Sequence, residues 1–333
     1  MGKKVLLKDV ALLAGVSDMT ASRALRGASD VSGATKQKVE EAALSLDYVP
    51  NRIAGALASQ RVNLVGVVVP SLSSQVFPTV LSGISDRLNG SPLKPVIGVS
   101  GYDLDEEEAV IREMLSWRPS GLIVAGLEHT DAARRMMMAA DCPVIEIMDV
   151  DGDPVAHCVG ISHIEAGRAM AREIVKRGYR RIGIVSTRAT RDFRAHKRMD
   201  GFQAELSDLG LEPEDSVFHI GASSVETGRQ LTGEILNRSP GLDCLYFSSD
   251  LMTIGAYMHC LAEGLSVPGD IALAGFNDLE MLQGLPLQLA TADAHRFEIG
   301  QKAAAIVLDC YDRPGGEART ETLPPTIRPG QSI

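Results

Sequence analysis

The sequence predicts an all-α head followed by a two-lobed α/β body with two doubly wound parallel sheets. Helical patterns fill the first 50 residues, and from residue 62 onward short Val/Ile/Leu runs alternate with amphipathic helical patterns. Charge divides at the same place: residues 1–61 carry nine Lys/Arg and six Asp/Glu, a balance of +3, within a chain of net charge −10. A basic head on an acidic body is typical of a small nucleic-acid-binding module joined to a globular domain.

Composition narrows the class of protein further. The chain has 333 residues, 45% of them hydrophobic, which is enough for two or three domains with their own cores. No apolar run has the length of a signal peptide or a membrane span, so we expect a cytoplasmic protein. We expect no bound metal, because no Cys or His pair has metal-ligand spacing. The five cysteines are scattered, at Cys142, Cys158, Cys244, Cys260 and Cys310.

The first two predicted helices are separated by a tight turn. Apolar residues at helical spacing predict a helix over Lys8–Ala14, which Gly15 ends because glycine adopts the left-handed conformation at little steric cost. Ser17 is a suitable N-cap for a second helix, in which Ala21 and Ala24 would face inward. A helix, a short turn and a second helix form the helix-turn-helix pattern. A three-helix bundle without a DNA role has the same pattern, so spacing alone leaves both interpretations open.

The rest of the head is predicted to be a third helix and a short connecting helix. Ser32 is the expected cap of a helix over Gly33–Leu46. Pro50 ends the segment that follows, and we place the boundary of the head there, at residues 1–50. Residues 51–61 are rich in small side chains and predict a short hinge helix and linker, too short to be stable alone.

The body, residues 62–333, has two sets of alternating strands and helices. The strand-like runs of the first set are Leu64–Val69, Pro95–Val99, Gly121–Ala125 and Val144–Ile147; those of the second are Ile182–Val185, Phe218–Ile220, Cys244–Phe247 and Ile271–Gly275. Such runs predict parallel sheets buried on both faces. We expect a first lobe over about 62–160 and 292–320, and a second over about 161–291 and 321–330. A ligand would bind beyond the carboxyl ends of the strands, in a cleft between the lobes.

The patterns of common nucleotide-binding and hydrolytic enzymes are absent from the sequence. There is no G-x-G-x-x-G after a strand, no G-x-x-x-x-G-K-[ST], and no nucleophile elbow. We therefore expect neither an enzyme nor a bound cofactor. A sugar-binding module without a DNA role is the remaining alternative, because the body resembles bilobed periplasmic sugar-binding proteins.

Five short motifs resemble the LacI/GalR family of bacterial repressors. They are Asp9-Val10-Ala11, Val16-Ser17, Thr20 with Ser22-Arg23, Val31-Ser32 and Tyr48-Val49-Pro50-Asn51-Arg52, and the resemblance continues along the whole chain. It implies a homodimer whose second helix enters the major groove of a pseudo-palindromic operator. It also implies that a small molecule bound in the body controls the affinity for DNA.

The resemblance assigns DNA contacts residue by residue. Asp18, Met19 and Arg23 match base-reading positions, and Arg23 is suited to bidentate pairing with guanine. Thr20, Ser22 and Asn51 match positions near phosphates, and Leu57 matches a leucine that wedges into the minor groove. Asp18 is unusual, since a carboxylate is repelled by phosphates. Two interpretations of Asp18 remain open. It accepts a hydrogen bond from cytosine N4, or it stabilises the N-terminus of its helix.

The expected effector ligands follow the predicted strands, except Arg198, which lies near the start of a predicted helix in the second lobe. They are Ser71, Gln75, Phe77, Glu146, Asp149, Arg198, Ser249 and Asn277. By resemblance, Asp149, Arg198, Ser249 and Asn277 match positions that touch inducer, although an asparagine is common where this chain has Ser249. We expect Asp250 and Asp278, which also follow strands, to cap helices.

Several segments of the body are most similar to the gluconate-repressor branch of the family. They include Pro70–Phe77, Met114–Trp117 and Glu146–Asp149. This similarity implies a sugar acid such as gluconate, whose carboxylate Arg198 would neutralise, aided by His163 or Arg188. A surface helix cap is the other interpretation of His163. A neutral sugar as effector, and a co-repressor that tightens DNA binding, remain open.

Overall fold

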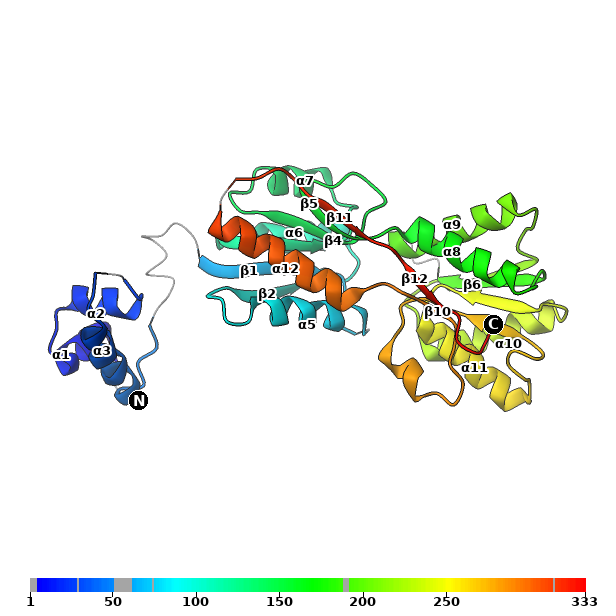
Figure 1. Cartoon of the computed structure of the whole chain (residues 1–333), viewed down its shortest axis with the longest axis horizontal. Helices are drawn as coiled ribbons and strands as arrows, with labels where there is room; N and C mark the ends of the chain where they lie inside the picture. Colours follow the sequence, from blue (N-terminus) through cyan, green and yellow to red (C-terminus); the bar gives the residue numbers. More distant parts are fainter. Residues whose placement is uncertain (1–4, 29, 51–61, 74, 188–191, 314) are drawn as a thin grey trace. The chain divides into compact units, whose positions relative to one another are not determined.

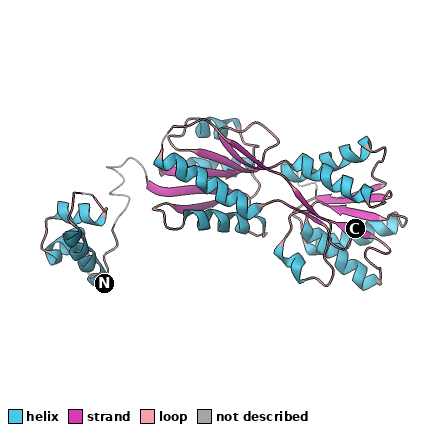
Figure 2. Cartoon of the chain, viewed as in Figure 1, coloured by secondary structure: helices cyan, strands magenta, loops and turns pink. Residues whose placement is uncertain are grey.

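The computed structural model describes residues 5–28, 30–50, 62–73, 75–187, 192–313 and 315–333. The chain forms two compact units, Met1–Val62 and Asn63–Ile333 (Figure 1). In its described residues the first unit is built around helices, whereas helices and strands alternate in the second (Figure 2).

The first unit is a bundle of the helices α1 (Leu7–Ala14), α2 (Asp18–Leu25) and α3 (Gly33–Ser45). Gly15 ends α1 in the left-handed conformation, with φ 68°, and the Ser17 side chain caps α2. The predicted inward face is the observed core. Its buried residues are Val10, Ala11, Ala21, Ala24, Val39, Ala42 and Ala43. Because these side chains are small, the three helices approach closely in spite of their short length.

Lobe 1 of the second unit contains a six-stranded sheet in the order β11-β5-β4-β3-β1-β2. The strands are β1 (Val62–Val69), β2 (Lys94–Val99), β3 (Pro119–Ala125), β4 (Val144–Asp149), β5 (His157–Ile161) and β11 (Thr320–Leu323). Its helices are α5 (Val76–Leu88), α6 (Leu104–Ser116), α7 (Asp131–Met138) and α12 (Arg296–Asp312). Because β11 pairs in parallel with β5 through Leu323, lobe 1 extends three residues beyond the expected boundary at 320.

Lobe 2 contains a four-stranded sheet in the order β7-β6-β8-β9. The strands are β6 (Ile182–Thr187), β7 (Asp215–His219), β8 (Cys244–Phe247) and β9 (Ala272–Ala274), and the paired strands run parallel. Helices α8 (His163–Lys176), α9 (Phe193–Asp208), α10 (Val225–Arg238) and α11 (Asp250–Glu263) and the 3-10 helix η1 (Glu280–Gly284) complete it. The continuous Val/Ile/Leu runs predicted as buried strands thus form sheets flanked by helices (Figure 2).

The chain passes between the lobes three times. It does so between β5 and α8, between the short strand β10 (Thr291–Asp293) and α12, and between β11 and β12 (Thr326–Arg328). Strands β10 and β12 pair antiparallel, so two of these connections are held together by backbone hydrogen bonds (Figure 1).

Candidate functional site

A pocket lies where the winding of lobe 1 reverses, beside β1 and β3. The sheet order places β1 between β2 and β3, and ligands of doubly wound sheets bind beyond the carboxyl strand ends at such a point. The pocket is lined by residues after β1, β2 and β3 and by the first turn of α9 from lobe 2. They are Pro70, Ser100, Tyr102, Asp103, Leu104, Glu107, Ala125, Gly126, Glu128, Phe193 and Arg194.

The segment after β1 holds three predicted effector ligands, and the structure gives them different surroundings. Phe77 is buried in the core of lobe 1. The half-buried Ser71 shares a hydrogen bond of 2.8 Å with the Ser73 hydroxyl. Gln75 is exposed, and its backbone carbonyl accepts from Arg296 Nη1 at 3.3 Å. Of the three, only Ser71 places a hydroxyl directly after the pocket-lining end of β1.

Glu146 is occupied inside lobe 1, which corrects its assignment as an effector ligand. It is fully buried in β4. One oxygen lies 3.2 Å from His129 Nε2, and the other accepts from the Val155 amide at 2.5 Å. His129 Nδ1 lies 2.5 Å from Glu107 Oε1. Burial alone lowers the pKa of His129, but the bonds to Glu107 and Glu146 outweigh it and raise the pKa to about 9. The imidazolium and two carboxylates therefore form a buried ionic cluster.

Asp149 makes a contact between the lobes. At the end of β4, its Oδ2 lies 2.5 Å from Lys197 Nζ of α9, and its Oδ1 accepts from the Asp151 amide at 2.9 Å. Lys197 Nζ also lies 2.6 Å from Glu128 Oε1. Burial lowers the pKa of Lys197, but the bonds to Asp149 and Glu128 outweigh it and raise the pKa above its usual value. One ammonium of lobe 2 is thus held by two carboxylates of lobe 1.

Arg198 is buried among neutral partners. Its Nη1 donates to His163 Nδ1 at 3.0 Å, its Nη2 donates to the Ser248 carbonyl at 3.1 Å, and the guanidinium lies 4.0 Å from the Phe276 ring centroid. His163 Nε2 in turn donates to the Met148 carbonyl at 2.9 Å. Burial, reinforced by the charge of Arg198, holds the pKa of His163 well below its usual value. His163 is therefore neutral and buried, so it neither helps to neutralise a carboxylate nor forms a surface cap.

Two predicted ligands of lobe 2 lie at strand ends with unusual features. Ser249 directly precedes α11, yet its hydroxyl does not cap the helix. The hydroxyl is buried and has no hydrogen-bond partner in the described part of the chain. Asn277 follows β9 at φ 120°, in a conformation that favours glycine, and is 8% exposed. An unpartnered buried hydroxyl and a strained backbone are features expected where a ligand completes the structure.

Asp250 and Asp278 were expected to cap helices. In the structure they instead connect separate segments of the chain. The buried Asp250 carboxylate accepts from the Leu279 amide at 2.9 Å and from the Thr291 hydroxyl at 2.7 Å. Burial raises the pKa of Asp250 to about 6. Asp278 pairs with Arg328 Nε at 2.8 Å. Both residues therefore brace the segment between β9 and β10.

Four residues of the cleft were not predicted from the sequence: Tyr102, Glu128, Arg194 and Lys197. Arg194 lies four positions before Arg198, so helical spacing could have placed both on one face of α9. Tyr102 and Glu128 follow strands of lobe 1, so the strand-end rule could have indicated both. Arg188, a possible aid to Arg198, lies outside the described residues.

The predicted base-reading residues lie on the exposed side of α2. Asp18, Met19 and Arg23 are exposed, and Met19 retains 71% of its accessible surface. Arg23 forms an ion pair with Asp30. The Thr20 hydroxyl is 2.8 Å from that of Ser17, and Ser22 is half-buried. The other two predicted DNA contacts, Asn51 and Leu57, lie outside the described residues.

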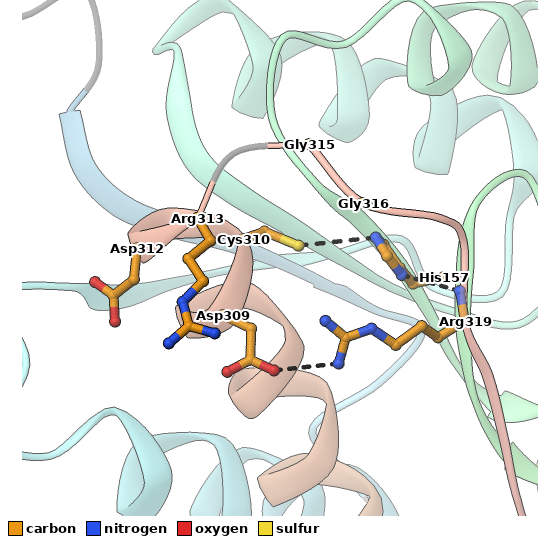
Figure 3. Close-up of a pocket in the computed structure, with 8 residues that line it drawn as sticks. All are labelled: His157, Asp309, Cys310, Asp312, Arg313, Gly315, Gly316 and Arg319. Atoms are coloured by element: carbon orange, nitrogen blue, oxygen red, sulfur yellow. Dashed lines mark hydrogen bonds and ion pairs between the residues drawn. The ribbon is translucent and has the colours of Figure 1, made fainter.

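A second pocket lies at the far end of lobe 1, where α12 ends and β5 and β11 begin (Figure 3). His157 Nδ1 accepts from the Arg319 amide at 3.2 Å, and Cys310 Sγ lies 3.8 Å from His157 Nε2. Burial and the charge of Arg319 lower the pKa of His157, and burial raises that of Cys310. The imidazole is therefore neutral and the thiol protonated, which does not activate the sulfur as a nucleophile.

Two α/β lobes joined by three connections, with polar and charged side chains between them, define a small-molecule-binding protein. The family described as periplasmic binding proteins and sugar binding domain of LacI family matches residues 22–324. The HTH-type transcriptional regulator GntR of Pseudomonas aeruginosa is 38% identical over 95% of this chain and 92% of its own length.

Two solved structures extend the comparison over the whole chain. A LacI-family transcriptional regulator from Silicibacter pomeroyi is 53% identical, with a TM-score of 0.94 and 99% of each chain covered. The lac repressor dimer bound to operator and the anti-inducer ONPF is 26% identical, with a TM-score of 0.86 over 99% of each chain. The chain belongs to the LacI family of transcriptional regulators. In its described residues, no helix has the length and apolar character needed to cross a membrane.

Proposed function

We propose that this protein is a homodimeric repressor of sugar-acid catabolism genes, released from its operator when a sugar acid such as gluconate binds between the lobes. The regulatory role follows the family, and the similarity to regulators named GntR supports the gluconate-like effector. We expect the protein to act by binding and not by catalysis, as its relatives are named transcriptional regulators.

The observation that carries the effector assignment is the chemistry of the cleft. Helix α9 brings Arg194, Lys197 and Arg198 to the boundary between the lobes. Arg198 Nε and Ser249 Oγ are buried and have no hydrogen-bond partner among the described residues. An unsatisfied buried polar atom costs about 1–3 kcal/mol, so these atoms are suited to a ligand rich in oxygen. The guanidinium groups of Arg194 and Arg198 are donors of the kind that a ligand carboxylate pairs with.

The DNA-binding part of the proposal rests on the head. We infer that α1 and α2 form a helix-turn-helix and that Asp18, Met19 and Arg23 read bases from the exposed side of α2. Thr20, Ser22 and Asn51 would contact phosphates, and Leu57 would enter the minor groove. The operator-bound lac repressor dimer supports a pair of heads on two half-sites.

Control requires that the effector favours one arrangement of the lobes. A sugar acid that bonds to both lobes stabilises a closed cleft, and in our proposal the closed state holds the two heads in an arrangement with lower affinity for the operator. The contact of Lys197 with Asp149 and Glu128 already joins the lobes at this point, so a ligand that rearranges it changes how the lobes meet.

A titration of DNA binding tests this function. The DNA is a fluorescent duplex that the full-length protein selects from a random pseudo-palindromic pool, with an unselected duplex as control. We expect gluconate to raise the Kd for the selected duplex at least about tenfold, which is about 1.4 kcal/mol of coupling. The neutral analogue glucitol should have little effect. No effect of any sugar acid contradicts the proposed effector, and tighter binding indicates a co-repressor.

A further inference from the structure

The three cations that α9 brings to the cleft differ in how far other protein groups already pair with them. Lys197 is fully engaged: its ammonium lies 2.5 Å from Asp149 and 2.6 Å from Glu128. Because two carboxylates face this one ammonium, the group as a whole is negative. An anionic ligand gains nothing by approaching it.

Arg198 is also committed within lobe 2. Its two terminal nitrogens donate to His163 Nδ1 and to the Ser248 carbonyl, and one face of the guanidinium lies over Phe276. Within the described part of the chain, Nε is the guanidinium nitrogen left without a partner. A carboxylate pairs best with two parallel N–H groups, whereas Arg198 has a single free nitrogen, which suits a hydroxyl.

Arg194 is the cation of α9 whose charge and N–H groups remain available to a ligand. Among the described residues it forms no ion pair. Burial raises the pKa of Tyr102 of lobe 1, and the nearby charge of Arg194 partly opposes that rise. Arg194 lines the pocket together with Tyr102 and Gly126. The guanidinium lies 5.6 Å from the Phe77 ring centroid, which limits its rotation by a cation–π contact.

Three further features suit this place to an anion. Arg194 lies in the first turn of the 16-residue helix α9, where the helix dipole favours negative charge; the Asp192 carboxylate at this end accepts from the Ala195 amide at 3.2 Å. A Cβ at Gly126, which has φ 109°, would lie 3.2 Å from Arg194 Nη1, so glycine leaves the guanidinium accessible at the β3 end. Burial raises the pKa of Tyr102, so its hydroxyl keeps a hydrogen to donate.

We propose that Arg194, with the Tyr102 hydroxyl beside it, binds the carboxylate of the effector and sets the preference for acids over neutral sugars. Arg198 then serves the polyol part of the ligand and positions His163. This assignment rests on the proposed function, since it concerns the same cleft, and it replaces Arg198 as the expected carboxylate ligand.

Calorimetry on the full-length protein with D-gluconate and D-glucitol tests the assignment, because glucitol replaces only the carboxylate by a neutral hydroxymethyl group. In Arg194→Gln we expect gluconate affinity to fall about 10- to 100-fold while glucitol binding is kept, so that the preference for the acid collapses. Tyr102→Phe should lower gluconate affinity alone, by a smaller factor. Arg198→Gln should weaken both ligands alike.

Arg229→Gln, at an exposed position of α10, is the matched control and should match the wild type. Arg194→Lys retains a charge and should keep part of the preference for the acid. Thermal unfolding of each variant confirms that it is folded. An Arg194→Gln protein that keeps the preference, or an Arg198→Gln protein that alone loses it, overturns the assignment. A wild-type protein that binds no gluconate contradicts the proposed function itself, and the assignment with it.

Discussion

At the residue scale, His129 carries the best-defined charge in the interior of lobe 1. Its side chain is inaccessible and lies between Glu107 and Glu146, which come from α6 and β4. These two bonds hold the imidazole in its charged form. Since Glu107 also lines the cleft pocket, the cluster connects the pocket wall to the centre of the sheet.

The cluster makes the stability of the body depend on pH in a defined direction. The pKa of His129 is raised from 6.5 to about 9 in the folded state. Its contribution is therefore complete below pH 6.5 and is lost as pH rises through 9. We expect the free energy of unfolding to fall by up to roughly 3 kcal/mol across this window.

Urea unfolding at a series of pH values measures this dependence. In His129→Gln, which has no titrating ring, the same window should be nearly flat, and the protein should be less stable at pH 7. If the free energy of unfolding of the two proteins changed with pH in parallel, His129 would not be the cause of the pH dependence.

Arg23 presents a second question at this scale, because the residue predicted to read guanine is paired with Asp30 in the head. Pairing with a base requires that this exposed ion pair opens, which costs little. We expect Arg23→Ala to lose about 1–3 kcal/mol of operator affinity and to relax one base position.

Anisotropy titrations against operators substituted base by base measure this effect. Asp30→Ala is the matched variant: it releases Arg23 and should keep the base preference. Unchanged affinity and base preference in Arg23→Ala would exclude the assigned role.

At the element scale, glycine pairs let helices cross at close range. A Cβ at Gly167 of α8 would lie 2.1 Å from the Arg198 carbonyl, and one at Gly201 of α9 would lie 2.1 Å from the Ile164 carbonyl. The α5–α12 and α10–α11 crossings have similar pairs. Since His163 begins α8 and Arg198 belongs to α9, the glycines of this crossing also determine how these two side chains meet.

Adding a methyl group at this crossing should affect both stability and the site. We expect Gly167→Ala to destabilise the protein by about 1–3 kcal/mol, because the helices must separate. Effector affinity should fall with it, since Arg198 moves relative to His163. Gly33→Ala is the control, as a Cβ there meets nothing within 4 Å. Chemical denaturation and calorimetry measure the two effects, and a Gly167→Ala protein with wild-type values in both would contradict the close crossing.

At the scale of the whole molecule, the proposed control is a coupling between two binding equilibria. Thermodynamic linkage requires that operator weakens gluconate binding by the same factor by which gluconate weakens operator binding. We expect equal factors from calorimetry of gluconate with and without operator and from DNA titrations with and without gluconate. Unequal factors would show that a further equilibrium, such as dissociation of the dimer, takes part.

The sequence by itself predicted many of the local elements of this protein. Apolar periodicity, Gly15 and the serine caps predicted the helices of the head within one residue, and Val/Ile/Leu runs indicated most interior strands. It did not reveal the long helix α12 or the strands β5, β10, β11 and β12. Strand β5 is five residues with a His, a Cys and a Gly, and β10 and β12 have three residues each. Such segments are too short for a periodic pattern and depend on pairing with distant strands.

For the site, the strand-end rule predicted Asp149 and Ser249, since local order determines where a strand ends, and the start of a predicted helix indicated Arg198. Tertiary structure alone decided which of these groups are free. Lys197 and Asp149 form their contact although 48 positions separate them in the sequence. Glu146 is paired with His129 in a cluster that no local sequence pattern indicates. The charge left over at Arg194 follows from these distant pairings. Whether a cation is available to a ligand depends on its partners, and folding of the two lobes selects those partners.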